Sequence, residues 1–173
     1  MKKRFSLFAA ACLLASTVSL PAAKASQITS SDIKGSLVIT GGSLGSSNAA
    51  VYQSFIKLAG GEKQAKIGIV PAASGKLKSS NDFKADLEKY GVRKENIEVL
   101  PLSNHDFSDT DFDESKWKDN VNKKEWADQI KNFTAIWFVG GDQLRITETL
   151  VDKKGKNSNV LDAIWNMYKK AVS

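Results

Sequence analysis

The stretch that decides the fold is Thr134-Ala-Ile-Trp-Phe-Val-Gly-Gly-Asp-Gln-Leu-Arg-Ile-Thr147, an apolar run followed by two glycines and a polar pair. The pattern predicts a buried strand over 135–139, a glycine turn, and a helix that begins near Gln143. In open α/β sheets, ligands bind at the carboxyl ends of the strands, where such turns lie. The two glycines therefore allow a close backbone approach to a ligand, and Asp142 and Gln143 add polar groups at the same edge.

The rest of the chain alternates short apolar runs with amphipathic segments. Strands are expected at 36–40, 65–70, 96–100 and 135–139, and helices at 48–59, 81–90, 125–133, 143–150 and 160–171. Alternation of this kind predicts a mostly parallel α/β sheet with crossover connections and helices on both faces. We assign residues 26–35 to a polar lead-in and 36–173 to a single α/β domain.

The first 25 residues have the pattern of a secretory signal peptide. Residues 2–4 are basic, residues 5–20 are mostly apolar, and 23–25 fit a small-x-small cleavage site. The apolar run is short for a membrane-spanning helix and is interrupted by serines, so no stable membrane anchor is expected after cleavage. The sequence therefore predicts a secreted or periplasmic protein that is cleaved after Ala25.

Removal of the signal peptide changes the charge balance. The whole chain has 25 basic and 19 acidic residues, but Lys2, Lys3, Arg4 and Lys24 lie in the signal. The mature part keeps 21 basic residues against 19 acidic ones, interleaved as on a solvated surface, and nucleic acid is not an expected partner. The one cysteine, Cys12, also lies in the signal, which excludes a thiol nucleophile, a disulfide and a cysteine metal site from the mature part.

The run Gly41-Gly-Ser-Leu-Gly45 fits the G-x-S-x-G pattern of a nucleophile elbow between an expected strand and an expected helix. One hypothesis is therefore an α/β hydrolase with Ser43 as nucleophile and with Asp82 and His105 as its acid and base. Against it, such an elbow normally comes several strands into the sheet, whereas this one is the first turn. The same run lacks the spacing of a phosphate loop. The favoured interpretation is a glycine turn that lines the sheet edge.

An acidic cluster follows the third expected strand. Its composition is like that of a calcium loop, with carboxylates at Asp106, Asp109, Asp111 and Asp113. The spacing lacks the central glycine and the closing glutamate that such a loop requires. A solvated surface loop is the favoured interpretation, and neither a metal nor an organic cofactor is expected.

Three blocks of the sequence share their order and spacing with a known enzyme family. They are Val51-Tyr-Gln-Ser-Phe-Ile-Lys-Leu-Ala-Gly-Gly61, Lys66-Ile-Gly-Ile-Val-Pro-Ala-Ala-Ser-Gly75 and Ile136-Trp-Phe-Val-Gly-Gly-Asp-Gln-Leu-Arg145. They resemble the cyanophycinase family of serine peptidases, peptidase family S51, and the resemblance covers roughly residues 37–173. It implies a doubly wound fold related to class I glutamine amidotransferases. It also implies hydrolysis of aspartyl peptides such as cyanophycin, which yields a β-aspartyl-arginine dipeptide.

The resemblance assigns roles to residues of the expected carboxyl edge. Gly141 and Asp142 would place backbone N–H groups near the oxyanion that develops during the reaction, as preorganised donors do in such enzymes. Dimerisation is expected from the family alone. The substrate pocket would be lined by Gln143, Gly41, Gly42 and Ser74.

The catalytic residues of the family have no counterpart within the chain. The family's nucleophilic serine lies in a glycine-flanked elbow after the helix that matches 160–171, so it is expected after Ser173, with the histidine and acid further on. His105 does not match the family's base. We therefore expect a truncated chain that is inactive by itself. The alternative is a non-catalytic peptide-binding α/β domain whose Gly-Gly-Asp-Gln edge holds an aspartyl or arginine-bearing peptide.

Overall fold

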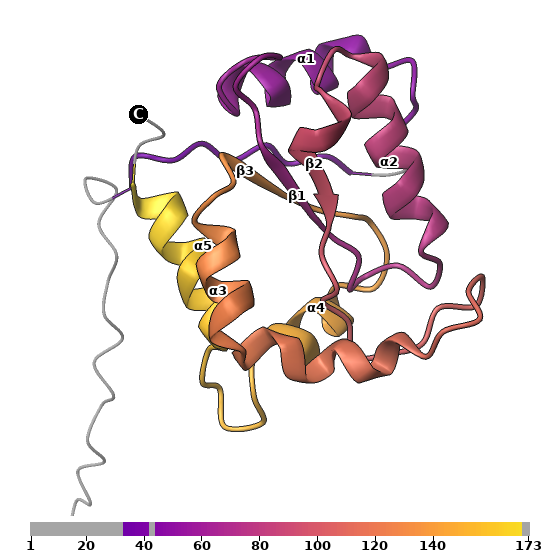
Figure 1. Ribbon diagram of the computed structural model, residues 1–173, viewed down its shortest axis with the longest axis vertical. Coiled ribbons are helices and arrows are strands. Elements are labelled where there is room, and N and C mark those ends of the chain that lie inside the picture. The colour runs from indigo at the N-terminus through magenta and orange to yellow at the C-terminus, as the bar shows by residue number, and fades with distance from the viewer. Residues whose placement is uncertain (1–32, 42–43, 171–173) are drawn as a thin grey trace, which may run out of the picture.

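The structure is a computed structural model that describes residues 33–41 and 44–170 (Figure 1). The predicted signal peptide at 1–25, most of the lead-in at 26–35, Gly42 and Ser43 lie outside the described residues. Within the described part of the chain, no helix has the length and apolar character needed to cross a membrane.

The described chain forms an α/β fold with one parallel three-stranded sheet. The elements are α1 (Ala49–Leu58), β1 (Ile67–Val70), α2 (Lys78–Lys89), η2 (Lys94–Asn96), β2 (Ile97–Val99), η3 (Glu114–Asn122), α3 (Lys124–Ile130), β3 (Ala135–Phe138), α4 (Gln143–Leu150) and α5 (Asn159–Lys169). The strand order is β2-β1-β3, and Ile67 of β1 is in register with Ile97 on one side and Ala135 on the other. The α/β class and the parallel pairing expected from the sequence are confirmed.

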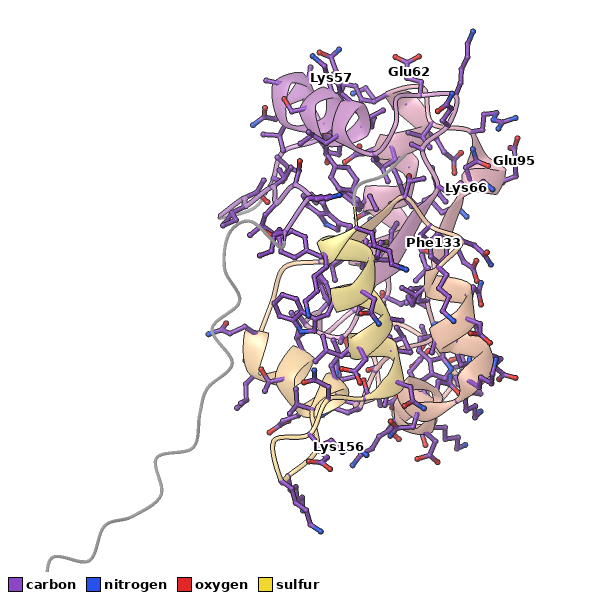
Figure 2. The ribbon with its side chains drawn as sticks, turned by 90° about the vertical axis from the view of Figure 1, so that its left-hand side faces the viewer. Lys57, Glu62, Lys66, Glu95, Phe133 and Lys156 are labelled. Atoms are coloured by element: carbon purple, nitrogen blue, oxygen red, sulfur yellow. The ribbon has the colours of Figure 1, made fainter. Side chains whose placement is uncertain are left out.

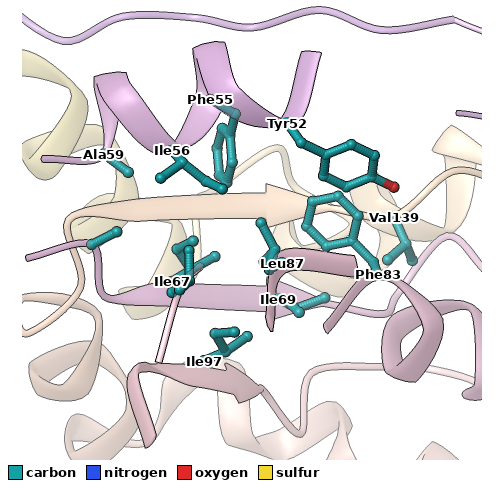
Figure 3. Close-up of a cluster of buried hydrophobic side chains, with 12 residues drawn as sticks. Tyr52, Phe55, Ile56, Ala59, Ile67, Ile69, Phe83, Leu87, Ile97 and Val139 are labelled. Carbon is teal, nitrogen blue, oxygen red and sulfur yellow. The ribbon is translucent and has the colours of Figure 1, made fainter. Parts of the chain in front are cut away.

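Alternate residues of the central strand face two separate cores. On one face, Ile67 and Ile69 of β1 lie beneath α1 and α2, where they join Phe55 and Phe83 in a single apolar cluster (Figure 3). On the other face, Val70 joins a second cluster drawn from α3, α4 and α5. Both faces of β1 are therefore buried, which explains why its sequence is a continuous apolar run and not an alternating one.

The strand predicted at 36–40 is not a strand in the structure. Leu37 and Ile39 are 67% and 83% exposed, and of these five residues only Val38 packs against the core. Because β2 and β3 take both edges of β1, only the outer edges of those two strands remain, and the segment pairs with neither. The 36–40 segment instead lines a groove of about 500 Å³, together with β3 and α5.

Helix α2 begins three residues before its predicted start at 81. The carboxylate of Asp109 accepts hydrogen bonds from the backbone N–H groups of Leu77 at 2.8 Å and Lys78 at 2.9 Å. These are orphan donors of the first helical turn, and a side chain that accepts from them stabilises the helix end. Because the cap comes from 31 residues further along the chain, local sequence did not predict it.

The surface carries both signs of charge, as the sequence predicts. Figure 2 shows the side chains of Lys57, Glu62 and Lys156 pointing away from the ribbon. Exposed ion pairs such as Lys78–Asp82, at 2.5 Å, lie along single helices. Pairs of this kind contribute little to stability because water screens them.

Candidate functional site

The loops that follow the three strands meet at the carboxyl edge of the sheet, where ligands bind in open α/β folds. The backbone N–H of Asp142 donates to the carbonyl oxygen of Ala73 at 2.9 Å, which ties the loop after β3 to the loop after β1. The ring Nε2 of His105, after β2, lies 2.7 Å from the carbonyl oxygen of Ser74. We call residues 72–75, 103–105 and 140–145 the loop cluster.

The turn between β3 and α4 is built for close backbone contact. Gly141 has a φ of 147°, and a Cβ at this position would lie 2.1 Å from the carbonyl oxygen of Ala73. The Asp142 carboxylate then accepts from the N–H of Leu144 at 2.9 Å and caps α4. Glycine is needed here because a side chain would clash and because L-residues avoid this backbone region.

The resemblance assigns Gly141 and Asp142 to the oxyanion, and the backbone N–H groups of these two residues differ in their hydrogen-bond partners. The N–H of Asp142 is occupied by Ala73, so in this conformation it does not point at a ligand. The N–H of Gly141 has no hydrogen-bond partner among the described residues. Of the two expected donors, Gly141 is therefore the one whose N–H no described residue uses.

The expected pocket residues also differ in accessibility. Gln143 is exposed at the first position of α4. The hydroxyl of Ser74 is buried, donates to the carbonyl oxygen of Lys76 at 2.8 Å, and lies 3.0 Å from the Ser79 hydroxyl. Ser74 thus shapes its own loop, while Gln143 remains free to contact a ligand. Gly41 is exposed, and its neighbour in the prediction, Gly42, lies outside the described residues.

Sequence reasoning missed Arg145, which the structure places inside the loop cluster. Its guanidinium Nη1 lies 3.2 Å from Nε2 of His105 and 3.7 Å from the position of a Cβ on Gly75. The sequence did contain a signal for this residue. The helix is predicted to begin at Gln143, so Arg145 falls in its first turn. A cation is unfavourable there, since the N-terminal end of a helix carries partial positive charge.

The Ser43 hydrolase hypothesis gains no support from the positions of its proposed partners. Asp82 is exposed on α2 and pairs with Lys78. The ring nitrogens of His105 contact the Ser103 hydroxyl at 3.2 Å and the Asn104 amide oxygen at 3.3 Å, in addition to Ser74 and Arg145. Within residues 33–41 and 44–170, Asp82 and His105 therefore share no hydrogen bond, and Ser43 lies outside the described residues.

The four aspartates of the acidic cluster are exposed, as expected for a surface loop, and the buried carboxylate of this segment belongs to the adjacent Glu114. Glu114 is buried and accepts from the Phe107 N–H at 3.2 Å and from the Thr110 hydroxyl at 2.9 Å. Burial acts to raise the pKa of Glu114, but these hydrogen bonds outweigh it and hold that pKa below its ordinary value. In the part of the chain that the structure describes, no three His, Cys, Asp or Glu residues come together as metal ligands would.

Two hollows in the structure lie away from the loop cluster. One, of about 450 Å³, is lined by the end of α1, the loop 60–64 and Tyr90, at the entrance to β1. The other is the groove between the 36–40 segment, β3 and α5. Neither hollow shares a residue with the loop cluster.

The fold places the protein in the α/β class. At the carboxyl edge of its parallel sheet, polar groups from the loops after the three strands lie together. No protein-family model matches the chain.

Proposed function

We propose that the chain supplies the substrate-binding half of a cyanophycinase-like serine peptidase site that hydrolyses aspartyl peptides of the β-aspartyl-arginine type. The observation that carries the proposal is the contact of the Gly141 turn with Ala73. Two of the three blocks that resemble the family, 66–75 and 136–145, are joined at the carboxyl edge by this contact. The doubly wound, amidotransferase-like architecture, the export signal and the dimer belong to the same proposal.

The proposal gives each exposed group of the turn a chemical task. The N–H of Gly141 donates to the oxyanion of the tetrahedral intermediate, and removal of one such donor typically slows a reaction about 10²–10³-fold. The Gln143 side-chain amide binds the aspartyl group of the substrate. Asp142 holds the turn in shape by capping α4. The nucleophilic serine, with its histidine and acid, is expected in chain that follows Ser173.

Binding of β-aspartyl-arginine to the chain tests the proposal without requiring the nucleophile. We expect amide NMR shifts that are concentrated at Gly140–Gln143 as the dipeptide is added. Gln143→Ala should weaken binding at least about tenfold, which corresponds to about 1.4 kcal/mol. Thr147→Ala, one turn further along the exposed side of α4, serves as the matched control. Shifts that avoid the loop cluster, or equal affinity in both variants, would contradict the proposal.

A second candidate is a peptide-binding α/β domain without catalysis. It is favoured by the two apolar cores that the described residues form on the two faces of the sheet. This candidate predicts a cooperative, monomeric thermal transition for the chain and no hydrolysis. Sequencing the gene past the codon for Ser173 separates the two candidates, because only the peptidase predicts a glycine-flanked serine soon afterwards.

A further inference from the structure

Arg145 is a half-buried cation that forms no ion pair with any residue the structure describes. It lies in the first turn of α4, where the partial positive charge of the helix end disfavours a cation. Asp142, the N-cap of that helix, uses its carboxylate to accept from the N–H of Leu144. Within the described part of the molecule, the guanidinium therefore has no anion that offsets its charge.

The contact of Arg145 with His105 does not supply the missing acceptor. Nε2 of His105 lies 2.7 Å from the Ser74 carbonyl oxygen, which can only accept, so Nε2 carries a hydrogen and donates it. A nitrogen that donates in this way has no lone pair left for the Nη1 hydrogen of Arg145, 3.2 Å away. The contact therefore joins two donors and brings the guanidinium no negative charge.

An exposed carboxylate, that of Glu148, lies on the same side of α4. Glu148 is three residues after Arg145, a spacing at which helical side chains are neighbours, yet the two are not paired in the structure. The Glu148 carboxylate instead accepts from the Asn104 amide at 3.3 Å, and Asn104 directly precedes His105. Arg145 and Glu148 thus contact two adjacent residues of one loop, and they offer opposite charges side by side.

The space beside the guanidinium is open to a ligand. Gly75 is exposed and has no side chain, and even a Cβ there would lie 3.7 Å from Nη1 of Arg145. Gln143, which the proposed function assigns to the aspartyl group, is exposed in the same helical turn. A ligand held by Gln143 can therefore extend along α4 towards Arg145 and Glu148.

The proposed substrate carries one charge of each sign on its branch. The expected product keeps the β-aspartyl-arginine linkage, so the scissile bond is an α-peptide bond, and the arginine stays attached to the aspartyl side chain through its α-amino group. Its free groups are an α-carboxylate and a guanidinium, which are both ionised at neutral pH. Inside a chain of such units, both carboxyl groups of the aspartyl residue are in amide bonds, so the only carboxylate belongs to the branch arginine.

We propose that Arg145 binds the α-carboxylate of the branch arginine and that Glu148 binds its guanidinium, so that the pair determines specificity for arginine-bearing aspartyl peptides. Both contacts join a planar guanidinium to a carboxylate, which allows two parallel hydrogen bonds in each. Side chains three residues apart on a helix have Cβ atoms about 5–6 Å from one another, a separation that one arginine can span. The inference rests on the proposed function, and it makes Arg145 and Glu148 binding residues that take no part in bond cleavage.

The test compares three ligands on the full chain by calorimetric titration. The first is β-aspartyl-arginine with its aspartyl amino group acetylated and its aspartyl α-carboxyl group converted to the methylamide, as inside a longer chain. The second has the arginine α-carboxylate as a carboxamide, and the third has neutral citrulline in place of arginine. The unmodified protein should bind the first ligand at least about tenfold more tightly than either of the others, as expected for loss of a hydrogen-bonded charge.

Two variants should each abolish one of these preferences and keep the other. Arg145→Gln should bring the carboxylate-to-carboxamide affinity ratio close to one and retain the preference for arginine over citrulline. Glu148→Gln should do the reverse. Arg93→Gln and Glu125→Gln, which remove exposed charges elsewhere on the surface, should leave both ratios unchanged. Equal weakening of all three ligands by Arg145→Gln or Glu148→Gln, with both ratios kept, is the result of a structural loss and overturns the inference.

Failure of this inference can be told apart from failure of the proposed function. If the first ligand binds and Gln143→Ala weakens it, but the unmodified protein binds all three ligands equally, the branch contacts are overturned and the proposed function stands. If none of the three ligands binds, the proposed function fails and the inference fails with it.

Discussion

The backbone N–H of Asp142 donates to the carbonyl oxygen of Ala73 at 2.9 Å, and this bond joins two loops that are separated by nearly 70 residues of chain. Gly141 makes the approach possible, because a Cβ on it would lie 2.1 Å from the same oxygen. The loop cluster therefore depends on a contact between main chains. Side chains of the site, including Gln143 and Arg145, are placed by this contact and by the helix that starts immediately after it.

Substitution of Gly141 should separate the two loops. Gly141→Ala introduces a clash with Ala73 and a strained φ, so we expect a loss of at least about 2 kcal/mol in the free energy of unfolding. Gly140→Ala is the matched control, since a Cβ there meets no atom within 4 Å. Urea unfolding of both variants measures the difference. Similar stabilities would show that the tight contact is not required.

The aromatic stack on one face of the sheet should dominate the stability of that core. The ring of Phe83 stacks on Trp137 with centroids 4.2 Å apart and on Tyr52 at 5.7 Å. Phe83→Ala removes a buried ring, so we expect a loss of about 3–5 kcal/mol together with a change in tryptophan fluorescence. Phe112→Ala, at a ring that is 51% exposed, should cost far less. Equal losses in the two variants would argue against this core.

The cap that Asp109 provides should make the start of α2 sensitive to acid. Partial desolvation acts to raise the pKa of Asp109, but the Lys78 and Leu77 N–H groups outweigh it and hold that pKa below 3.8. Because the folded pKa is lower than the unfolded one, the stabilisation is present above the unfolded value. The stabilisation by the cap is lost as the pH falls through the pKa of Asp109 in the folded protein. Asp109→Asn should therefore lower the free energy of unfolding at neutral pH. It should also make the fall of that free energy between neutral and acidic pH less steep.

Urea unfolding at about pH 6 and about pH 3 measures this change in slope. Asp111→Asn, in the same loop, is the control, because Asp111 is exposed and caps no helix. A decline in acid that is as steep in Asp109→Asn as in the unmodified protein would mean that the cap does not account for it.

The exposed 36–40 segment should tolerate polar substitution at alternate positions. Ile39→Ser changes a side chain that is 83% exposed, so the free energy of unfolding should stay within about 0.5 kcal/mol. Val38→Ser, at the one residue of the segment that packs on the core, should cost more than about 1 kcal/mol. If Ile39→Ser were the costlier variant, the segment would be a buried strand, as its sequence predicts.

Local pattern was sufficient for most of the elements. The apolar run 65–70 predicted β1, the turn at Gly140 predicted the end of β3, and Gln143 was correctly placed at the start of α4. These features depend on short-range physics: a strand buried on both faces is apolar throughout, and a polar residue after a glycine turn caps the helix that follows. The resemblance to cyanophycinases, and the roles it assigns, remain proposals.

The failures share one cause, which is contact between segments far apart in sequence. Residues 36–40 have a strand-like pattern, but in the structure they pair with no strand of the sheet. The acidic cluster is an exposed loop, as its sequence predicts, but the cap that Asp109 places on α2 could not be read from local sequence. The periodicity of a sequence predicts which residues are buried, but it does not predict which other segment of the chain covers them.

The sequence by itself determined the α/β class, the parallel alternation of strands and helices, and the edge at which polar groups follow the strands. Those properties are encoded in local periodicity and in glycine turns. Only the tertiary structure decided that the Asp142 N–H is occupied by Ala73 and that Arg145 lies beside His105. Such relationships arise when packed helices bring loops together, and the energies that fix them belong to pairs of residues that no local stretch of sequence contains.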